Sequence, residues 1–176
     1  METREVLFSR KSVRSYNGKI SEDKLKAILM AAQASPVGMG KYETMHLTVI
    51  EQPHLLQAIE ASTAKMFGRP DMHPLYGAPA FVVVSVKPEG EKPDNSELSN
   101  AAIMVHNMAI AAVDAGVGCC DIWGAVMAIG LDENLVGQLE LPEGFVPCCG
   151  IVLGETDEKY LSREIDENRV VVNYVR

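Results

Sequence analysis

Hydrophobic residues follow two spacings along the chain, and the two spacings predict helices that alternate with strands. Apolar positions at helical spacing occur in five segments: residues 2–8, 21–34, 53–66, 97–115 and 132–139. Short β-branched or continuous apolar runs predict three strands, at residues 45–50, 79–86 and 147–153, with a further short apolar stretch at 118–123. This alternation predicts an α/β or α+β fold.

The most apolar of these segments carry expectations about burial. The strand at 79–86 is almost continuous hydrophobe, so we expect it to be covered on both faces and central to the sheet. The helix at 97–115 is rich in alanine and methionine and apolar on nearly all sides, which predicts burial in the core or in a subunit interface. The β-prone segment 169–176 must bury itself too, either on the sheet edge of its own subunit or on a partner.

Length and composition predict one domain spanning residues 1–176, with 47% hydrophobic residues to form a core. The 16 basic and 24 acidic residues give a net charge of -8, which argues against a general role in binding nucleic acid or an anionic membrane. No apolar run approaches the roughly 20 residues that span a bilayer, and the N-terminus is too polar for a signal peptide. We therefore expect a cytoplasmic protein.

The four cysteines stand in two adjacent pairs, Cys119-Cys120 and Cys148-Cys149. Neither pair has the spacing that places two thiolates on one zinc ion, and the histidines show no metal-ligand spacing. The apolar surroundings favour small buried hydrophobic residues over a redox or metal role. A thiol enzyme using Cys119 or Cys149 with His106 is an alternative that only the cysteine pairs support.

Two single residues have a simple structural interpretation beside a functional one. His106 lies within the apolar helix, where a hydrogen-bonded core histidine is the simpler interpretation. Trp123 is the only tryptophan, and core packing is a simpler role for it than lining a ligand pocket.

The strongest candidate for ligand binding is the basic stretch Arg10-Lys11-Ser12-Val13-Arg14. In an extended segment Arg10, Ser12 and Arg14 point the same way, and two guanidinium groups with a hydroxyl suit a phosphate monoester. Spacing alone supports a solvated basic turn equally well. Gly38-Met39-Gly40 lacks the third glycine of a dinucleotide-binding motif and precedes a strand, so side chains would have to hold the phosphate.

Further short motifs follow the basic stretch in a definite order: Ala31 to Pro36, Tyr76-Gly77-Ala78-Pro79, Ala111 to Gly118, Pro142-Glu143-Gly144 and Leu153-Gly154. Together with Arg10 to Tyr16, this ordered set resembles the FMN-dependent nitroreductase family over nearly the whole chain. No single motif is specific, and the resemblance depends on their order.

The resemblance implies an α+β fold of three layers, with a central mixed or antiparallel sheet flanked by helices and the long buried helix at a dimer interface. It implies a homodimer that binds FMN at the subunit interface. NADH or NADPH would donate a hydride, and a nitroaromatic, quinone or similar small acceptor would receive the electrons in a ping-pong reaction. A non-catalytic protein of the same fold that stores, delivers or senses FMN is the alternative.

The resemblance also assigns cofactor-binding residues in four groups, and it assigns no catalytic side chain because the flavin carries the chemistry. The phosphate group comprises Arg10, Lys11, Ser12 and Arg14. The loop against the flavin ring and ribityl chain comprises Pro36, Val37, Gly38 and Gly40. The segment whose backbone approaches flavin N5 comprises Gly118, Cys119, Cys120 and Asp121. Arg163 matches a basic residue that reaches the phosphate, with Lys159 as a competing choice.

The chain departs from the family in the loop after Pro36. The family's Asn-x-Gln-Pro-Trp is replaced by Gly40-Lys41-Tyr42-Glu43-Thr44, so the asparagine that hydrogen-bonds the flavin ring is missing. Lys41 could place a positive charge near the flavin, although a solvent-facing lysine is the simpler interpretation.

Overall fold

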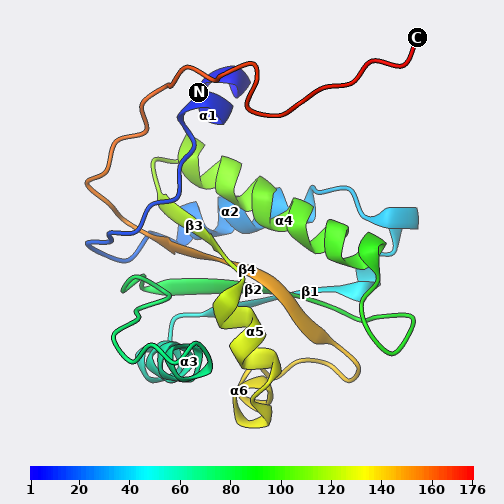
Figure 1. Ribbon diagram of the computed structural model, residues 1–176. Helices are drawn as coiled ribbons and strands as arrows, with labels where there is room; N and C mark the ends of the chain where they lie inside the picture. Colours follow the sequence, from blue (N-terminus) through cyan, green and yellow to red (C-terminus); the bar gives the residue numbers. More distant parts are fainter.

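A four-stranded sheet lies between two layers of helices in the computed structural model, which describes residues 1–176 (Figure 1). All neighbouring strands are antiparallel, in the order β1 (Met45–Ile50), β2 (Ala80–Val86), β4 (Val146–Gly154) and β3 (Gly118–Ile122). One face is covered by α1 (Thr3–Ser9), α2 (Glu22–Gln33) and α4 (Asn95–Asp114), and the other by α3 (Pro53–Met66), α5 (Gly124–Gly130) and α6 (Glu133–Gln138). The predicted three-layer α+β fold is confirmed, with a wholly antiparallel sheet.

β2 is the buried centre of this sheet, as its apolar sequence predicted. All seven of its residues are buried, because it pairs with β1 on one side and with β4 on the other. Alternation along the strand sends Val82, Val84 and Val86 into the core beneath α2 and α4, while Phe81 and Val83 face α3 and α5. The sheet therefore separates two hydrophobic cores.

Local sequence signals explain where the helices begin. The Ser21 hydroxyl accepts a hydrogen bond from the Lys24 N–H at 3.3 Å, so it caps α2 as predicted. Pro53 occupies the first turn of α3. α4 starts two residues earlier than predicted, because Asp94 and Glu97 form a capping box in which each side chain accepts the other's backbone N–H.

Several expectations about single segments are wrong. α5 was not predicted, because its sequence GAVMAIG has no capping residue and is too short to show a helical repeat. Leu7, an apolar residue of the predicted helix at 2–8, is exposed while Val6 is buried, because α1 packs one face on α4. His106 is exposed on α4 and Trp123 is 52% exposed, so neither packs in the core.

The C-terminal segment does not lie on the sheet edge of its own subunit. Residues 170–176 form no strand, no hydrogen bond joins them to the rest of the chain, and Figure 1 shows them extending away from the body. Their apolar side chains are among the most exposed in the molecule: Val170, Val171, Val172, Tyr174 and Val175. The first of the two predicted places for this segment is therefore wrong, and packing on a partner stays a prediction.

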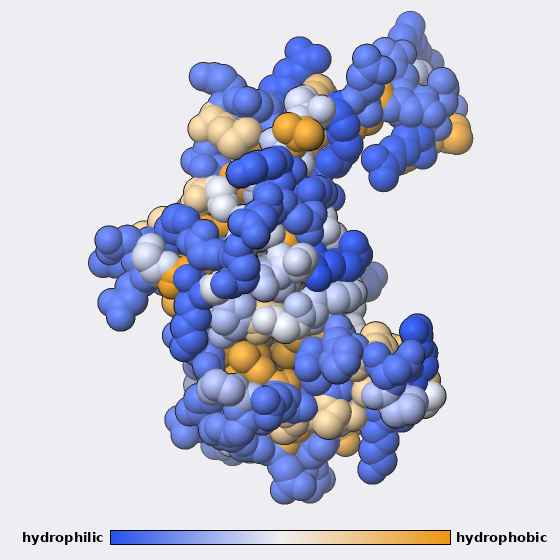
Figure 2. Space-filling view, turned by 90° about the vertical axis from the view of Figure 1, so that its left-hand side faces the viewer, coloured by the Kyte–Doolittle hydropathy of each residue, from blue (hydrophilic) through white to orange (hydrophobic).

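The surface is mainly hydrophilic on the side seen in Figure 2, with apolar residues in separate patches. None of the helices combines the length and the apolar character that crossing a membrane requires.

Candidate functional site

The basic segment connects α1 to α2 and lies between β3 and the chain that follows β4. On one side the Val13 N–H donates to the Cys119 carbonyl at 2.8 Å, and the Val13 side chain is fully buried. On the other side Asn17 N–H donates to the Glu155 carbonyl at 2.9 Å, and the Thr156 hydroxyl to the Ser15 carbonyl at 2.8 Å. Segments more than 100 residues apart in sequence thus fix the backbone of residues 13–18.

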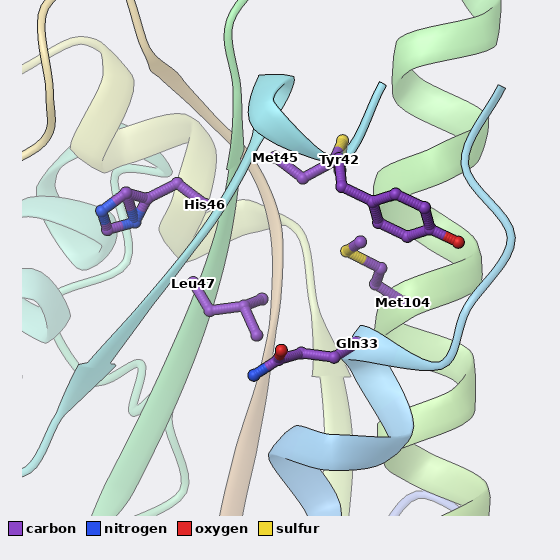
Figure 3. Close-up of a pocket in the computed structure, with 6 residues that line it drawn as sticks. All are labelled: Gln33, Tyr42, Met45, His46, Leu47 and Met104. Carbon is purple, nitrogen blue, oxygen red and sulfur yellow. The ribbon is translucent and has the colours of Figure 1, made fainter. Parts of the chain in front are cut away.

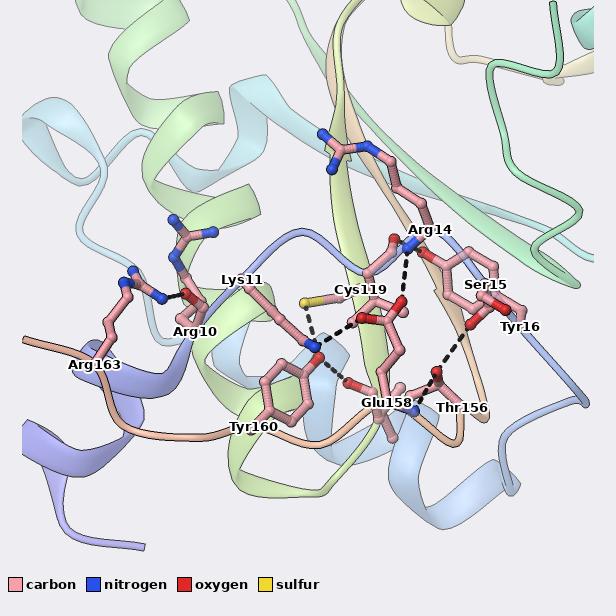
Figure 4. A network of polar contacts seen from close by, with 12 residues as sticks. Arg10, Lys11, Arg14, Ser15, Tyr16, Cys119, Thr156, Glu158, Tyr160 and Arg163 are labelled. Atoms are coloured by element: carbon pink, nitrogen blue, oxygen red, sulfur yellow. Dashed lines mark hydrogen bonds and ion pairs between the residues drawn. The ribbon is translucent and has the colours of Figure 1, made fainter.

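Side chains along this segment divide between its two sides, as Figure 4 shows. Lys11 points toward the C-terminal chain, where its ammonium forms a 2.7 Å ion pair with Glu158. Arg10 and Arg14 extend to the other side of the segment. Alternation in an extended backbone explains the division, because residues 10 and 14 are an even number of positions apart and residue 11 is not.

Arg10 and Arg14 form no salt bridge with an acidic side chain, although the chain has an excess of acidic residues. Arg14 lies instead against the ring of Tyr76, with its guanidinium carbon 5.5 Å from the ring centroid. Two guanidinium groups without a salt bridge, together with the hydroxyl of Ser12, which lies between them in the sequence, form a donor set that fits an anion such as a phosphate monoester.

β3 places further polar groups next to these arginines. Burial raises the pKa of the Asp121 carboxyl, while the charges of Arg10 and His106 partly oppose that rise. Burial also raises the pKa of the Cys120 thiol, against the influence of Ser12 and Arg14. Arg10, Ser12, Arg14, Cys120 and Asp121 therefore share one electrostatic environment, which unites the predicted phosphate group with the predicted β3 segment.

Two half-buried tyrosines donate hydrogen bonds to backbone carbonyls in the basic segment and just before β3. The Tyr16 hydroxyl donates to the Val13 carbonyl at 2.8 Å, and the Tyr160 hydroxyl donates to the Val117 carbonyl at 2.7 Å. Burial is the largest cause of the raised pKa of both phenols, so they stay neutral and act as structural donors.

Arg163 lies beside the basic segment, and Lys159 does not contact it. The Arg163 backbone N–H donates to the Phe8 carbonyl at 3.2 Å, and its guanidinium donates to the Arg10 carbonyl (Figure 4). Lys159 is exposed and forms no ion pair or hydrogen bond. Of the two competing basic residues, the geometry therefore favours Arg163 as the one near the arginine pair.

The predicted flavin-ring loop lies at the other end of α4 from the basic segment (Figure 1). Pro36 and Val37 lead into a short 3₁₀ turn, η1 (Gly38–Gly40), whose Gly38 N–H donates to Asn100 Oδ1 on α4 at 3.1 Å. No hydrogen bond or ion pair joins this loop to residues 10–14. A single subunit therefore does not bring the four predicted groups together.

A cavity of about 590 Å³ opens beside this loop (Figure 3). Its lining includes Tyr42 from the second 3₁₀ turn, η2 (Tyr42–Thr44), and the apolar side chains of Met45, Leu47 and Met104. Lys41 is outside this lining and lies at the surface, where its ammonium pairs with the exposed Glu89. The cavity is therefore mostly apolar and contains none of the predicted phosphate residues.

The thiols are poor candidates for nucleophiles. Burial raises the pKa of Cys119 and of Cys149 to about 12, so both are protonated at neutral pH. The Cys119 thiol lies 3.8 Å from the Ala109 carbonyl and from the Tyr160 hydroxyl, and no hydrogen bond joins it to His106. The cysteines are packing residues, as their apolar surroundings predicted, and the thiol-enzyme alternative loses its support.

Sequence reasoning missed two residues that shape the site. Glu158 neutralises Lys11, and one of its oxygens lies 3.4 Å from the Arg14 backbone N–H. Tyr76 contacts Arg14 from a loop 62 positions further along the chain. Neither residue has a local signal, because both contacts depend on which distant segments lie side by side.

Comparisons with known proteins identify a family and a fold for the chain. The sequence model of the nitroreductase family matches residues 7–155, which include the basic segment and all four strands. A search of curated protein sequences finds no match.

Three solved structures are similar over almost their full length. An FMN-bound nitroreductase from Desulfitobacterium hafniense has a TM-score of 0.84 and 23% sequence identity, and the match covers 100% of this chain and 99% of that one. An FMN-bound nitroreductase from Bacteroides fragilis has a TM-score of 0.82 and 24% identity, with 99% of this chain and 100% of that one covered. An FMN-dependent nitroreductase from Clostridium difficile has a TM-score of 0.80 and 21% identity, with 97% of this chain and 99% of that one covered. At these identities the likeness shows a common fold.

Proposed function

The chain belongs to the nitroreductase family, and on that premise we propose that it is an FMN-dependent NAD(P)H oxidoreductase. The observation that carries the proposal is the hydrogen-bonded backbone of the basic segment, which places the guanidinium groups of Arg10 and Arg14 on one side of it, beside β3. Because the chain has a net charge of -8, an anionic cofactor needs a local basic site, and these two arginines provide one. Their fixed backbone favours the anion, because an ordered segment binds it with little further loss of conformational entropy.

In the proposed complex, Arg10, Ser12 and Arg14 bind the phosphate of FMN. Lys11 contributes less than the arginines because Glu158 already pairs with its ammonium. Gly118, Cys119, Cys120 and Asp121 provide the backbone along which the flavin lies, and Arg163 adds positive charge next to Arg10. When bound, FMN supplies the hydride chemistry, and the chain binds and orients it.

We propose a homodimer because the site is incomplete in one subunit. The loop of Pro36, Val37, Gly38 and Gly40 lies too far along α4 to join its own basic segment, so a partner's loop would complete the pocket. The exposed valines of residues 170–176 support association, since a solvated apolar segment of this kind gains free energy by packing on a second chain.

The proposed reaction has two halves that share one site. NADH or NADPH donates a hydride, leaves, and is replaced by a nitroaromatic, quinone or similar small acceptor, which gives ping-pong kinetics. Steady-state rates measured with the FMN-loaded protein at several acceptor concentrations test this order. Parallel double-reciprocal lines are expected, whereas intersecting lines would show that donor and acceptor bind together.

A flavin-storage or sensing protein is the second candidate. The observation that favours it is the loop at η1, where Gly38, Met39 and Gly40 provide no polar side chain in place of the family's asparagine. The same kinetic experiment separates the two functions. Sustained NADH or NADPH oxidation supports the reductase, and FMN binding without turnover supports storage or sensing.

A further inference from the structure

Arg14 has one close partner for its charge, and that partner is aromatic. Its guanidinium carbon lies 5.5 Å from the Tyr76 ring centroid, inside the distance at which a cation is attracted to the face of a ring. A polar interaction with the same side chain is the largest cause of the raised pKa of Arg14. Because no carboxylate forms a salt bridge with the exposed guanidinium, the Tyr76 side chain is the main group that restrains it.

The Tyr76 backbone is itself held in an unusual conformation. Its φ of 56° is in the left-handed region, where a bulky L-residue is strained. Hydrogen bonds on either side maintain this turn: Tyr76 N–H donates to the His73 carbonyl and Ala78 N–H to the Leu75 carbonyl, both at 3.0 Å. Leu75 is buried and anchors the turn in the core. The chain thus keeps an aromatic ring where glycine or asparagine would fit the backbone better.

We propose that Tyr76 is a positioning residue that holds the Arg14 guanidinium in place for the phosphate of FMN. This assignment rests on the proposed function, in which Arg14 binds that phosphate. Tyr76 acts through Arg14: the ring restricts the rotamers of a long side chain before the ligand arrives, so less conformational freedom is lost on binding. Because a ring attracts a cation without neutralising it, the guanidinium keeps its charge for the anion.

Equilibrium titrations with FMN and with riboflavin, which lacks the phosphate, test the assignment. Tyr76→Asn removes the ring and keeps a residue that tolerates the left-handed conformation, and Tyr76→Phe removes only the hydroxyl. Tyr76→Asn is expected to weaken FMN binding by about two- to fivefold, the range for a cation–π contact at an exposed site. Riboflavin affinity stays unchanged, and Tyr76→Phe has a smaller effect on FMN.

Arg4→Ala is the matched control, because it removes a cation–π contact of the same kind in which Arg14 takes no part: the Arg4 guanidinium carbon lies 5.1 Å from the Phe8 ring centroid on α1. It is expected to leave both affinities unchanged. A double-mutant cycle provides the sharper test: in an Arg14→Ala background, Tyr76→Asn causes no further loss of FMN affinity if it acts through Arg14.

The assignment of Tyr76 would be overturned if Tyr76→Asn weakened FMN binding as much in the Arg14→Ala background as in the unaltered protein. It would also be overturned if Tyr76→Asn weakened riboflavin binding as much as FMN binding. So would FMN binding that Tyr76→Asn leaves unaffected. Absence of FMN binding by the unaltered protein is a different result, because it overturns the proposed function and the role of Tyr76 with it.

Discussion

Arg10 and Arg14 decide whether the basic segment is a phosphate site or a solvated turn. Replacing either by alanine is expected to weaken FMN binding about tenfold or more, because a charge-assisted hydrogen bond is lost. The fold should be unaffected, since neither side chain forms a salt bridge. FMN titration and far-ultraviolet circular dichroism measure the two effects.

Lys11→Met is the comparison, and a smaller loss of FMN affinity is expected from it because Glu158 pairs with Lys11. If both arginine variants retained all of their flavin through dialysis, the basic segment would be a solvated turn and not a phosphate site.

The buried thiols predict how stability depends on alkaline pH. Folding raises the pKa of Cys119 and Cys149 to about 12, from a usual value of 9.0. Above pH 9 the unfolded chain therefore loses thiol protons that the folded chain keeps, so the free energy of unfolding falls as pH rises. The limiting slope is about 1.4 kcal/mol per pH unit for each thiol.

Urea unfolding between pH 8 and pH 11 measures this dependence. The double variant Cys119→Ala, Cys149→Ala is the control, and its stability should fall less steeply because those two groups no longer titrate. An identical slope in the variant and the unaltered protein would mean that the thiols titrate alike in both states.

At the scale of elements, Gly118 determines how closely β3 approaches the basic segment. A Cβ atom there would lie 3.0 Å from the Gly154 carbonyl oxygen and from Val13 Cγ1. Gly118→Ala is expected to cost about 1–3 kcal/mol of stability by overpacking, and to weaken FMN binding by displacing Val13. Gly137→Ala in α6 is the control, because nothing lies within 4 Å of its added Cβ. Thermal unfolding and FMN titration of both variants provide the comparison. If the two variants had the same stability and the same FMN affinity, the proposal that β3 forms part of the site would be wrong.

Elements with local signals were predictable, and those without were not. Ser21, Pro53 and the continuous apolar run of β2 fix their helices and strand through neighbouring residues, so the sequence predicted them correctly. α5 has no such signal. No local signal predicts the strand order either. The position of β4 between β2 and β3 depends on how helices from the whole chain pack on both faces of the sheet.

For the whole molecule, the sequence predicted that the basic segment and β3 lie together, and it did not predict that the loop at Gly38 lies apart from them. Motif order identified Arg10, Ser12, Arg14 and β3, and the structure brings these together. The structure separates these residues from the loop at Gly38. The separation follows from the length of α4, and no local pattern in the sequence predicts it. The contact of Tyr76 with Arg14 is likewise set by tertiary packing.

Quaternary structure is the prediction that belongs to this scale. Truncation after Arg169 removes exposed residues that no hydrogen bond joins to the body, so the subunit should fold unchanged. We expect it to shift the monomer–dimer equilibrium toward monomer and to weaken FMN binding in parallel. Sedimentation velocity over a range of protein concentrations, with and without FMN, measures both. Replacement of the three valines 170–172 by serine at full length is the control for chain length. A truncated protein that remains a dimer with full FMN would place the interface elsewhere.

The visible absorption spectrum of the purified protein, titrated with FMN and then with NADH or NADPH under anaerobic conditions, tests the central claim most directly. A flavoprotein oxidoreductase is expected to bind FMN with a stable visible spectrum, and to lose that absorption when either nicotinamide is added. A protein that acquires no flavin absorption after incubation with FMN and removal of the excess would contradict it.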